Sequence, residues 1–208
     1  MRISAAIFDL DGTLANTALI HKEAWEIGLK KLGIVTNVKI EYLLGRKTSD
    51  IAKLLAGERW KELVEVKNKE YLHLVETKAE ATKCAKEVTS YLIQKFVKIA
   101  VVTSSNRISA TKVLSKIGVN YDVLVTSDDV MKGKPDPEPI VTALNSLGVM
   151  PHESIGVGDT EVDVEAYYNS RLSRIFLVKS GVPFSEEKVR SKNAIIIDSL
   201  CELFELIS

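Results

Sequence analysis

Four aspartates in this sequence stand directly behind apolar segments, where carboxylates could act on a phosphoryl group. Asp9 and Asp11 close the first apolar run of the chain. Asp159 and Asp163 follow a later run. Carboxylates at close range repel each other, and a divalent cation relieves that repulsion. Mg²⁺ prefers oxygen ligands and usually takes one or two protein carboxylates together with water and phosphate, so Asp9 and Asp159 are the candidate ligands.

Hydroxyl groups and a lysine that could hold phosphate follow other apolar runs. Thr103 and Ser104 come directly after residues 97–102, and Lys134 stands in a Gly-Lys-Pro sequence. The lysine is a compact positive charge suited to phosphate, and the Thr103 hydroxyl and the backbone N–H groups near Ser104 could bind phosphoryl oxygens. A carboxylate can also be a nucleophile that forms an aspartyl-phosphate, which leaves Asp11 as a general acid and base.

The elements that must position these residues alternate between strand and helix. Strands are expected at residues 3–10, 97–102, 123–125, 154–157, 175–178 and 195–197. Helices are expected at about 108–117 and up to Leu147, each stopped by a glycine, then up to about Tyr168, with a final helix at the end of the chain. This alternation predicts an α/β fold with a doubly wound parallel sheet, in which ligands bind at the carboxyl ends of the strands.

A charged and apolar block with helical spacing interrupts the alternation after the first strand. It contains several amphipathic helices and no proline, and no strand-like run appears before Val97. We expect a helical insertion over residues 17–80 and an α/β core formed by residues 1–16 and 81–208.

Composition and charge exclude several functional classes. Of the 208 residues 46% are hydrophobic, which excludes disorder over most of the chain. With 28 basic and 28 acidic residues, no global field recruits nucleic acid or an anionic membrane. No apolar run is long enough to span a membrane. The two cysteines, Cys84 and Cys201, form neither a disulfide framework nor a four-ligand zinc site, and Cys84 is expected to be a small apolar filler. We expect a cytoplasmic protein.

Taken in order, the motifs resemble those of the haloacid dehalogenase-like hydrolase superfamily over essentially the whole chain. Asp9–Thr13 matches the Asp-x-Asp-Gly-Thr motif in full, and Thr103 matches the second motif, a strand that ends in Thr or Ser. Lys134 matches the Gly-Lys-Pro motif, and Gly158–Asp163 matches the last motif. Alone, each of these residues would more often be a turn, helix-cap or surface residue, so the signal lies in their order.

The resemblance implies roles for the aspartates. Asp9 is then the nucleophile and a Mg²⁺ ligand. Asp11 is the general acid and base and ligates the ion through its backbone carbonyl. Asp159 completes the metal site.

The resemblance also implies how phosphate and substrate are held. Thr103 and Lys134 bind the phosphate, and Asp163 supports the site, through Lys134 or through a metal-bound water. The insertion at residues 17–80 is similar to the family's small helical cap. The subgroup that fits best contains phosphoglycolate phosphatases, β-phosphoglucomutases and related sugar-phosphate phosphatases.

Cap residues should set specificity. Gly45–Thr48 is similar to a cap loop that faces the core site in this subgroup, and Arg46 could meet a substrate carboxylate or hydroxyl. A solvated helix connection is the alternative. His21 and Trp25 share one helical face, and His21 either reaches the mouth of the site or is a structural residue of the cap.

These observations predict a phosphoric monoester hydrolase. The expected reaction is Mg²⁺-dependent hydrolysis of a small phosphorylated metabolite, phosphoglycolate-like or a sugar phosphate, through an aspartyl-phosphate. A β-phosphoglucomutase-type isomerase is the first alternative, but Gly158 stands where sugar phosphomutases often have Glu. Asp11 argues against dehalogenation, because true dehalogenases lack this residue. A non-enzymatic phospho-receiver domain is the last alternative. The substrate itself and the oligomeric state stay open.

Overall fold

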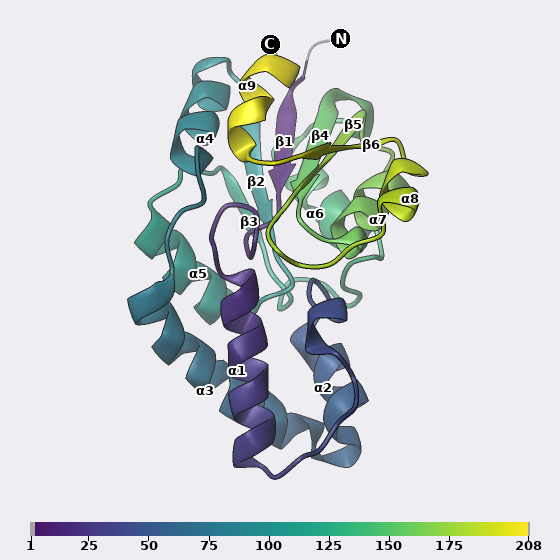
Figure 1. Cartoon of the computed structure of the whole chain (residues 1–208). Helices are drawn as coiled ribbons and strands as arrows, with labels where there is room; N and C mark the ends of the chain where they lie inside the picture. Colours follow the sequence, from purple (N-terminus) through teal and green to yellow (C-terminus); the bar gives the residue numbers. More distant parts are fainter. Residues whose placement is uncertain (1–2, 208) are drawn as a thin grey trace.

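A six-stranded parallel sheet forms the centre of the molecule in the computed structural model, which describes residues 3–207 (Figure 1). The strand order is β3-β2-β1-β4-β5-β6. The strands are β1 Ala5–Phe8, β2 Lys98–Val102, β3 Val123–Val125, β4 Ser154–Gly158, β5 Arg174–Val178 and β6 Ala194–Ile197. The predicted doubly wound parallel sheet is confirmed, and all six strands coincide with the apolar runs of the sequence.

Helices cover both faces of this sheet. The helices of the chain are α1 Ala18–Lys31, α2 Thr48–Ala56, α3 Trp60–Lys78, α4 Ala85–Gln94, α5 Arg107–Ile117, α6 Glu138–Leu147, α7 Glu161–Asn169, α8 Glu186–Arg190 and α9 Leu203–Leu206. The predicted helix ends at Gly118 and Gly148 are confirmed, since both glycines adopt the left-handed conformation behind α5 and α6. The short helix α8 was not predicted, because its five residues form no recognisable amphipathic pattern.

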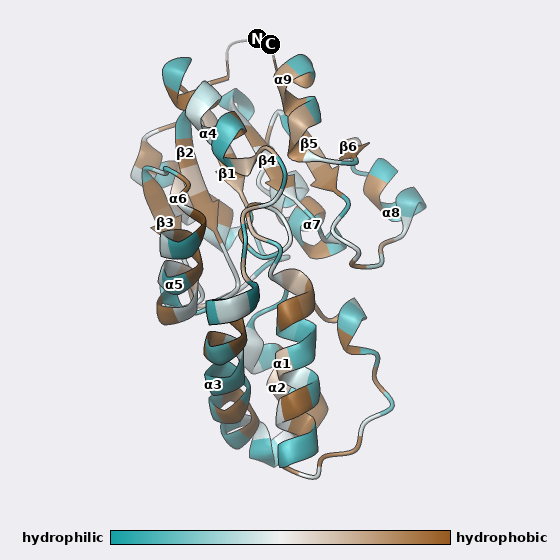
Figure 2. Cartoon of the chain, turned by 60° about the vertical axis from the view of Figure 1, so that its left-hand side comes forward, coloured by the Kyte–Doolittle hydropathy of each residue, from teal (hydrophilic) through white to brown (hydrophobic). Residues whose placement is uncertain are grey.

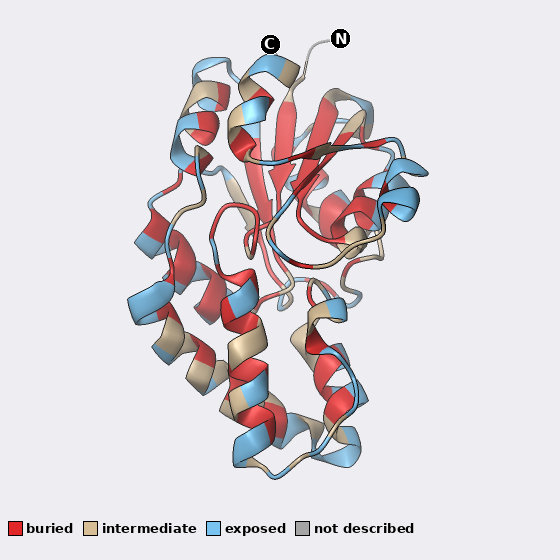
Figure 3. Cartoon of the chain, viewed as in Figure 1, coloured by how far each residue is buried: buried red, intermediate tan, exposed pale blue. Residues whose placement is uncertain are grey.

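Two apolar layers lie on the two faces of the sheet, because successive strand residues point to opposite sides. Phe8 of β1 belongs to the layer under α4, α5 and α9, and Ile7 belongs to the layer under α6, α7 and α8. The central strands β1 and β4 are buried along their whole length, as expected for a parallel sheet, and the charged residues lie on the outer sides of the helices (Figures 2 and 3).

Helices α1, α2 and α3 form a separate helical layer beyond the carboxyl ends of the strands (Figure 1). Trp25 and Leu29 of α1 pack there with Ile51 of α2 and Leu63 of α3 in an apolar cluster, which Val182 from the segment behind β5 also joins. Two chain segments connect this layer to the sheet, and they are paired with each other. The backbone N–H of Asn16 donates to the Glu80 carbonyl at 3.0 Å. We propose that residues 17–80 act as the cap and call the paired segments, residues 13–17 and 79–84, the cap linkers.

A disulfide joins Cys84 to Cys201, with Cα atoms 5.2 Å apart. The prediction of a small apolar filler at Cys84 is therefore wrong. The bond was invisible in the sequence because it spans 117 residues, and only the packing of the chain end next to the start of α4 brings the two sulfurs together. It fastens the segment before α9 to the second cap linker, of which Cys84 is the last residue. No helix among residues 3–207 is both long and apolar enough to span a membrane.

Candidate active site

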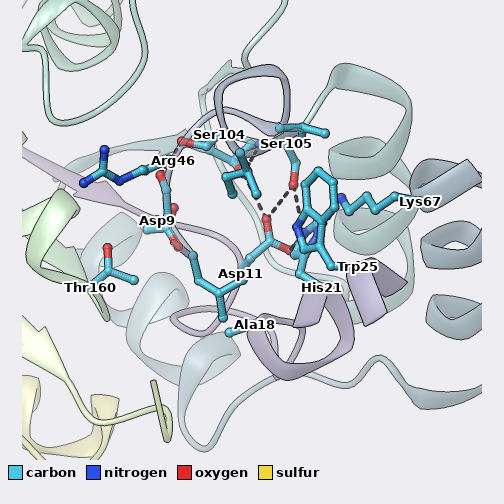
Figure 4. A pocket seen from close by; sticks show the side chains of 15 residues that line it. Asp9, Asp11, Ala18, His21, Trp25, Arg46, Lys67, Ser104, Ser105 and Thr160 are labelled. Atoms are coloured by element: carbon cyan, nitrogen blue, oxygen red, sulfur yellow. Dashed lines mark hydrogen bonds and ion pairs between the residues drawn. The ribbon is translucent and has the colours of Figure 1, made fainter. Parts of the chain in front are cut away.

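The four predicted motifs meet at one edge of the sheet. β1 lies between β2 and β4, so Asp9, Thr103 and Asp159, which follow these three strands, are neighbours at the carboxyl ends. A cavity with about 40 Å³ of space open to water-sized molecules lies between this edge and the cap helices (Figure 4). Asp9, Asp11 and Thr103 line it from the sheet, and His21 and Arg46 line it from the cap.

Lys134 lies between two carboxylates at the centre of the site. Its Nζ donates to Asp9 Oδ1 at 2.6 Å and to Asp163 Oδ1 at 2.5 Å. A third bond goes to the backbone carbonyl of Val102 at 3.1 Å, so all three ammonium hydrogens have an acceptor. Burial alone would lower the pKa of Lys134, but the charges of Asp163 and Asp9 raise it above its usual value. This lysine is therefore a fixed positive charge.

Asp163 is oriented by the start of α7. Thr160 caps this helix by accepting a hydrogen bond from the backbone N–H of Asp163. In return, Asp163 Oδ2 accepts from the Thr160 backbone N–H at 3.1 Å and from its hydroxyl at 2.6 Å. This capping box leaves Oδ1 free for Lys134. The contact with Lys134 is one of the two routes that the sequence suggested for support by Asp163.

Asp159 is held by donors from two other segments. Ser180, in the loop behind β5, donates to Asp159 Oδ2 at 2.6 Å, and the Thr13 hydroxyl lies 3.5 Å from Oδ1. The chain passes close to this carboxylate at Gly12, whose φ is +97°. A Cβ at Gly12 would lie 2.1 Å from Asp159 Oδ2, so both the turn and the approach require glycine.

The buried carboxylates carry more negative charge than their surroundings balance. Oxygen atoms of Asp9, Asp159 and Asp163 lie within 4.8 Å of one another, and Lys134 is the ammonium in contact with this group. Burial raises the pKa of Asp9 to about 8, with Lys134 opposing the shift and the charges of Asp163 and Asp11 adding to it. The pKa of Asp159 is raised by burial and by the charges of Asp9 and Asp163.

Asp11 has a different environment, although it is only two residues away. Its carboxylate accepts hydrogen bonds from Thr17 at 2.6 Å and Tyr71 at 2.8 Å on one oxygen, and from Thr103 at 3.0 Å and Ser105 at 2.9 Å on the other. Burial raises its pKa, but the neighbouring His21 and the hydrogen bonds from Thr17 and Tyr71 outweigh this and bring the pKa well below its usual value.

The cap supplies a buried polar group beside Asp11. His21 Nε2 lies 3.1 Å from Asp11 Oδ1, and the ring stacks on Tyr71 with centroids 3.8 Å apart. Lys67 Nζ lies 2.9 Å from His21 Nδ1. When Lys67 is protonated it has only hydrogens to offer, so Nδ1 is then the acceptor and Nε2 carries the proton that faces Asp11. Burial and the charge of Lys67 lower the pKa of His21, so the imidazole is neutral at neutral pH.

The predicted phosphate-binding residues have protein partners in this conformation. The Thr103 hydroxyl donates to Asp11, and the Ser104 hydroxyl donates to the Gly45 carbonyl of the cap at 2.6 Å. Gly45, with φ of +89°, lies so close to Thr160 that a Cβ would be 2.6 Å from its hydroxyl oxygen. The predicted substrate loop thus rests on the core at the rim of the catalytic cavity.

Arg46 and Trp25 also line the cavity, whereas His73 and His152 do not. Arg46 is exposed, and its guanidinium has no hydrogen-bond or ion-pair partner among residues 3–207. Trp25 is buried beside Lys67. His73 and His152 are exposed.

Sequence reasoning missed three residues of the site: Lys67, Tyr71 and Ser180. Lys67 and Tyr71 belong to a buried stripe on α3 with Leu63 and Val75, spaced by four residues. A lysine within an apolar stripe of that spacing is a signal that the sequence does carry. Ser180 gives no such signal, because a serine behind a strand is common and its partner is distant in the chain.

Comparisons with known proteins agree with this geometry. The sequence profile of the haloacid dehalogenase-like hydrolases matches residues 6–176. A phosphoglycolate phosphatase of Aquifex aeolicus is 34% identical over 169 residues, which are 77% of this chain and 78% of that protein. The pyrophosphatase PpaX of Halalkalibacterium halodurans is also 34% identical, over 79% of this chain and 78% of its own length.

Solved structures share the fold at lower identity. A hydrolase from Pseudomonas syringae has a TM-score of 0.87 at 24% identity, covering 97% of this chain and 96% of its own. A β-phosphoglucomutase from Clostridium difficile has a TM-score of 0.85 at 24% identity. The match covers 99% of this chain and 95% of that protein's chain. With the family profile over most of the chain and all four motifs at one sheet edge, the chain belongs to the haloacid dehalogenase-like hydrolase family, among its phosphatases.

Proposed function

We propose that this phosphatase hydrolyses a small phosphate monoester through an aspartyl-phosphate on Asp9 and needs Mg²⁺. The observation that carries the proposal is the buried cluster of Asp9, Asp159 and Asp163 around Lys134, in which Asp9 lines the cavity. Such a cluster has the charge and the oxygen donors for a divalent cation and for a phosphoryl group bound against it.

The donor set fits Mg²⁺. The candidate ligands are hard oxygen atoms. The raised pKa values of Asp9 and Asp159 reflect burial first and then the neighbouring negative charges, and a cation would offset both. Asp9 and Asp159 would hold the ion with their side chains, and Asp11 would do so with its backbone carbonyl. Asp163 is engaged by Lys134 and Thr160 and serves to orient the lysine. When bound, Mg²⁺ would neutralise charge on the phosphoryl oxygens.

The proposed reaction has two steps. A carboxylate oxygen of Asp9 forms a bond to phosphorus while the bond from phosphorus to the leaving oxygen breaks, and Asp11 gives a proton to that oxygen. Asp11 then takes a proton from the water that attacks the aspartyl-phosphate, which releases inorganic phosphate and restores Asp9. Lys134, Thr103 and the backbone near Ser104 would hold the phosphoryl oxygens.

Cap movement would control the proton of Asp11. Two of the donors that lower its pKa, His21 and Tyr71, stand on α1 and α3 of the proposed cap. An open cap withdraws these donors, so that the pKa of Asp11 rises and it can take up a proton. A cap that closes over substrate excludes water and lowers this pKa again, which favours transfer of the proton to the leaving oxygen. The cap would thereby couple substrate entry to the protonation that the first step requires.

The small cavity and its charged lining favour a compact leaving group. About 40 Å³ of space is open between the sheet edge and the cap, and Arg46 and Lys67 line it from the cap side. A phosphoglycolate-like substrate, whose carboxylate could meet Arg46, fits these features, and a sugar phosphate requires the cap to open further. The names of the Aquifex and Halalkalibacterium relatives, a phosphoglycolate phosphatase and a pyrophosphatase, support a small anionic substrate.

A sugar phosphomutase is the second candidate function. The β-phosphoglucomutase likeness supports only the fold, because the identity is 24%. Gly158 stands before Asp159, and a Cβ at this position would lie 2.4 Å from the Cβ of Asp163. A glutamate there would require α7 to shift, so the sequence next to the metal site favours hydrolysis.

A panel of phosphorylated metabolites tests the proposal. Phosphoglycolate, pyrophosphate, glucose phosphates and p-nitrophenyl phosphate should be offered with Mg²⁺ and with EDTA, and released phosphate measured. We expect Mg²⁺-dependent release, fastest with a small anionic substrate, and none from Asp9→Asn. Equal release in EDTA would contradict the metal requirement. Interconversion of glucose phosphates that depends on a bisphosphate, without net phosphate release, would identify the mutase instead.

A further inference from the structure

A second cavity lies next to the cap linkers and outside the catalytic site. It has about 440 Å³ of space open to water-sized molecules, and Ala18 is the one lining residue that it shares with the catalytic cavity. The cap linkers contribute Asn16, Thr82 and Lys83 to its wall, and the segments that follow β5 and β6 form the opposite wall. These segments meet near the centre of Figure 1, between α1 and the carboxyl ends of the strands.

We call this second cavity, between the cap linkers and the segments behind β5 and β6, the hinge cavity. Its two walls are joined covalently. Cys84 directly follows the wall residue Lys83, and Cys201 directly follows the wall residue Leu200. Their disulfide therefore ties the second cap linker to the segment behind β6. Hydrogen bonds from Thr82 to Leu14 at 3.0 Å and from Asn16 to Glu80 at 3.0 Å hold the two linkers together. The cavity is thus pre-formed, as small-molecule sites usually are.

The lining combines an apolar surface with an unpaired positive charge. Leu19, Val178 and Leu200 supply apolar side chains, and Leu19 is 51% exposed. Lys179 is engaged by Asp198 at 2.7 Å, whereas Lys83 has no hydrogen-bond or ion-pair partner within residues 3–207. The charged lining residues thus leave one ammonium unbalanced. An organic anion with an apolar body matches this surface, with its anionic group at Lys83.

The hinge cavity also borders the support of the catalytic centre. Ser180 in its wall donates to Asp159 at 2.6 Å, and the wall residue Gly12 is the one that passes directly over the same carboxylate. A ligand here would contact both cap linkers and the loop that orients Asp159. We propose that this cavity is a second ligand site, for a small organic anion with an apolar body, and that its occupancy restrains the cap linkers and lowers kcat. The effect on kcat rests on the proposed function, whereas binding does not.

Binding is tested with 8-anilinonaphthalene-1-sulfonate, a fluorescent organic anion with an apolar body, titrated into the full chain at saturating inorganic phosphate. We expect saturable binding of one dye per chain. Lys83→Glu and Leu19→Asp should each weaken it at least about tenfold. The matched controls Lys69→Glu and Leu54→Asp change an exposed lysine and an exposed leucine elsewhere and should leave it unchanged. Binding that no hinge-cavity variant weakens, or weakening equal to that in the controls, would overturn the proposal.

Folding of the variants is checked by circular dichroism, and Lys83→Gln, which removes the charge without reversing it, replaces Lys83→Glu if that variant unfolds. In a second arm, the dye should lower kcat for p-nitrophenyl phosphate in the wild type and not in the Lys83 variant. An unchanged kcat with the dye bound would overturn the restraint on the cap. A wild type without any turnover would contradict the proposed function and leave the binding result standing.

Discussion

The ammonium of Lys67 lies 2.9 Å from Nδ1 of His21, in the buried layer between the cap and the catalytic carboxylates. Lys67 is 1% exposed, and its ammonium also lies over the rings of Trp25 and Tyr71 and 3.5 Å from Asn68 Oδ1. Burial lowers its pKa to about 7, with the charge of Asp11 opposing the shift. While Lys67 is protonated, this contact selects the tautomer of His21 and therefore the proton that His21 presents to Asp11.

We expect Lys67 to make stability depend on pH. Its pKa falls from 10.5 in the unfolded chain to about 7 in the folded protein. Between these values the unfolded chain binds one more proton, so the free energy of unfolding rises with pH from about 7 to 10.5, by at most about 1.4 kcal/mol per unit. Lys67→Met should flatten this slope, whatever its effect on stability at one pH. Lys69→Met, which replaces an exposed lysine on the same helix, should leave the slope unchanged. Urea unfolding across this pH range measures both, and a slope unchanged in Lys67→Met would contradict the shift.

Ser180 should strengthen metal binding through Asp159. Ser180→Ala removes the 2.6 Å hydrogen bond to Asp159 Oδ2, and loss of such a support typically costs 10–100-fold in metal affinity. We expect calorimetric titration to show weaker Mg²⁺ binding by about that factor, with kcat largely restored at saturating Mg²⁺. Ser173→Ala, which removes a serine bond to a backbone carbonyl elsewhere in the core, is the control. Equal Mg²⁺ affinity in Ser180→Ala and wild type would show that Ser180 does not support metal binding.

Arg46 should affect substrates unequally. Its guanidinium is a fork that can bind a carboxylate with two hydrogen bonds, and p-nitrophenyl phosphate has no carboxylate to offer. Steady-state kinetics of Arg46→Ala should therefore show a larger rise in KM for phosphoglycolate than for p-nitrophenyl phosphate. Arg59→Ala, which removes an exposed cap arginine outside the cavity, should change neither. An equal rise in KM for both substrates would show that Arg46 does not recognise the substrate carboxylate.

The bond between Cys84 and Cys201 should contribute strongly to stability. Closing a loop of about 100 residues removes chain entropy worth about 4.7 kcal/mol in the unfolded state. For a chain of this length, that corresponds to a fall in Tm of about 10 °C or more on reduction. Differential scanning calorimetry with and without a phosphine reductant measures it. The Cys84→Ser/Cys201→Ser double variant should already melt low and respond to reductant no further. A reductant-independent Tm in the wild type would contradict the disulfide.

The positions of the candidate site residues could be predicted from the sequence because they depend on strand ends. Asp9, Thr103 and Asp159 each follow an apolar run, and adjacent parallel strands bring such residues to one edge. The environment of Asp11 could not be predicted in this way. It depends on how α3 packs against α1, which brings Tyr71 to a carboxylate 60 residues away in the chain.

Phosphoenzyme trapping with a ³²P-labelled substrate, followed by acid quench and peptide mapping, tests covalent catalysis most directly. The wild type should carry label on the peptide that contains Asp9, and Asp9→Asn should carry none. Asp11→Asn keeps the nucleophile and the backbone ligand, so it should still bind substrate while turning over about 10²–10⁴-fold more slowly. Label on another residue, or near-normal turnover by Asp9→Asn, would contradict nucleophilic catalysis by Asp9.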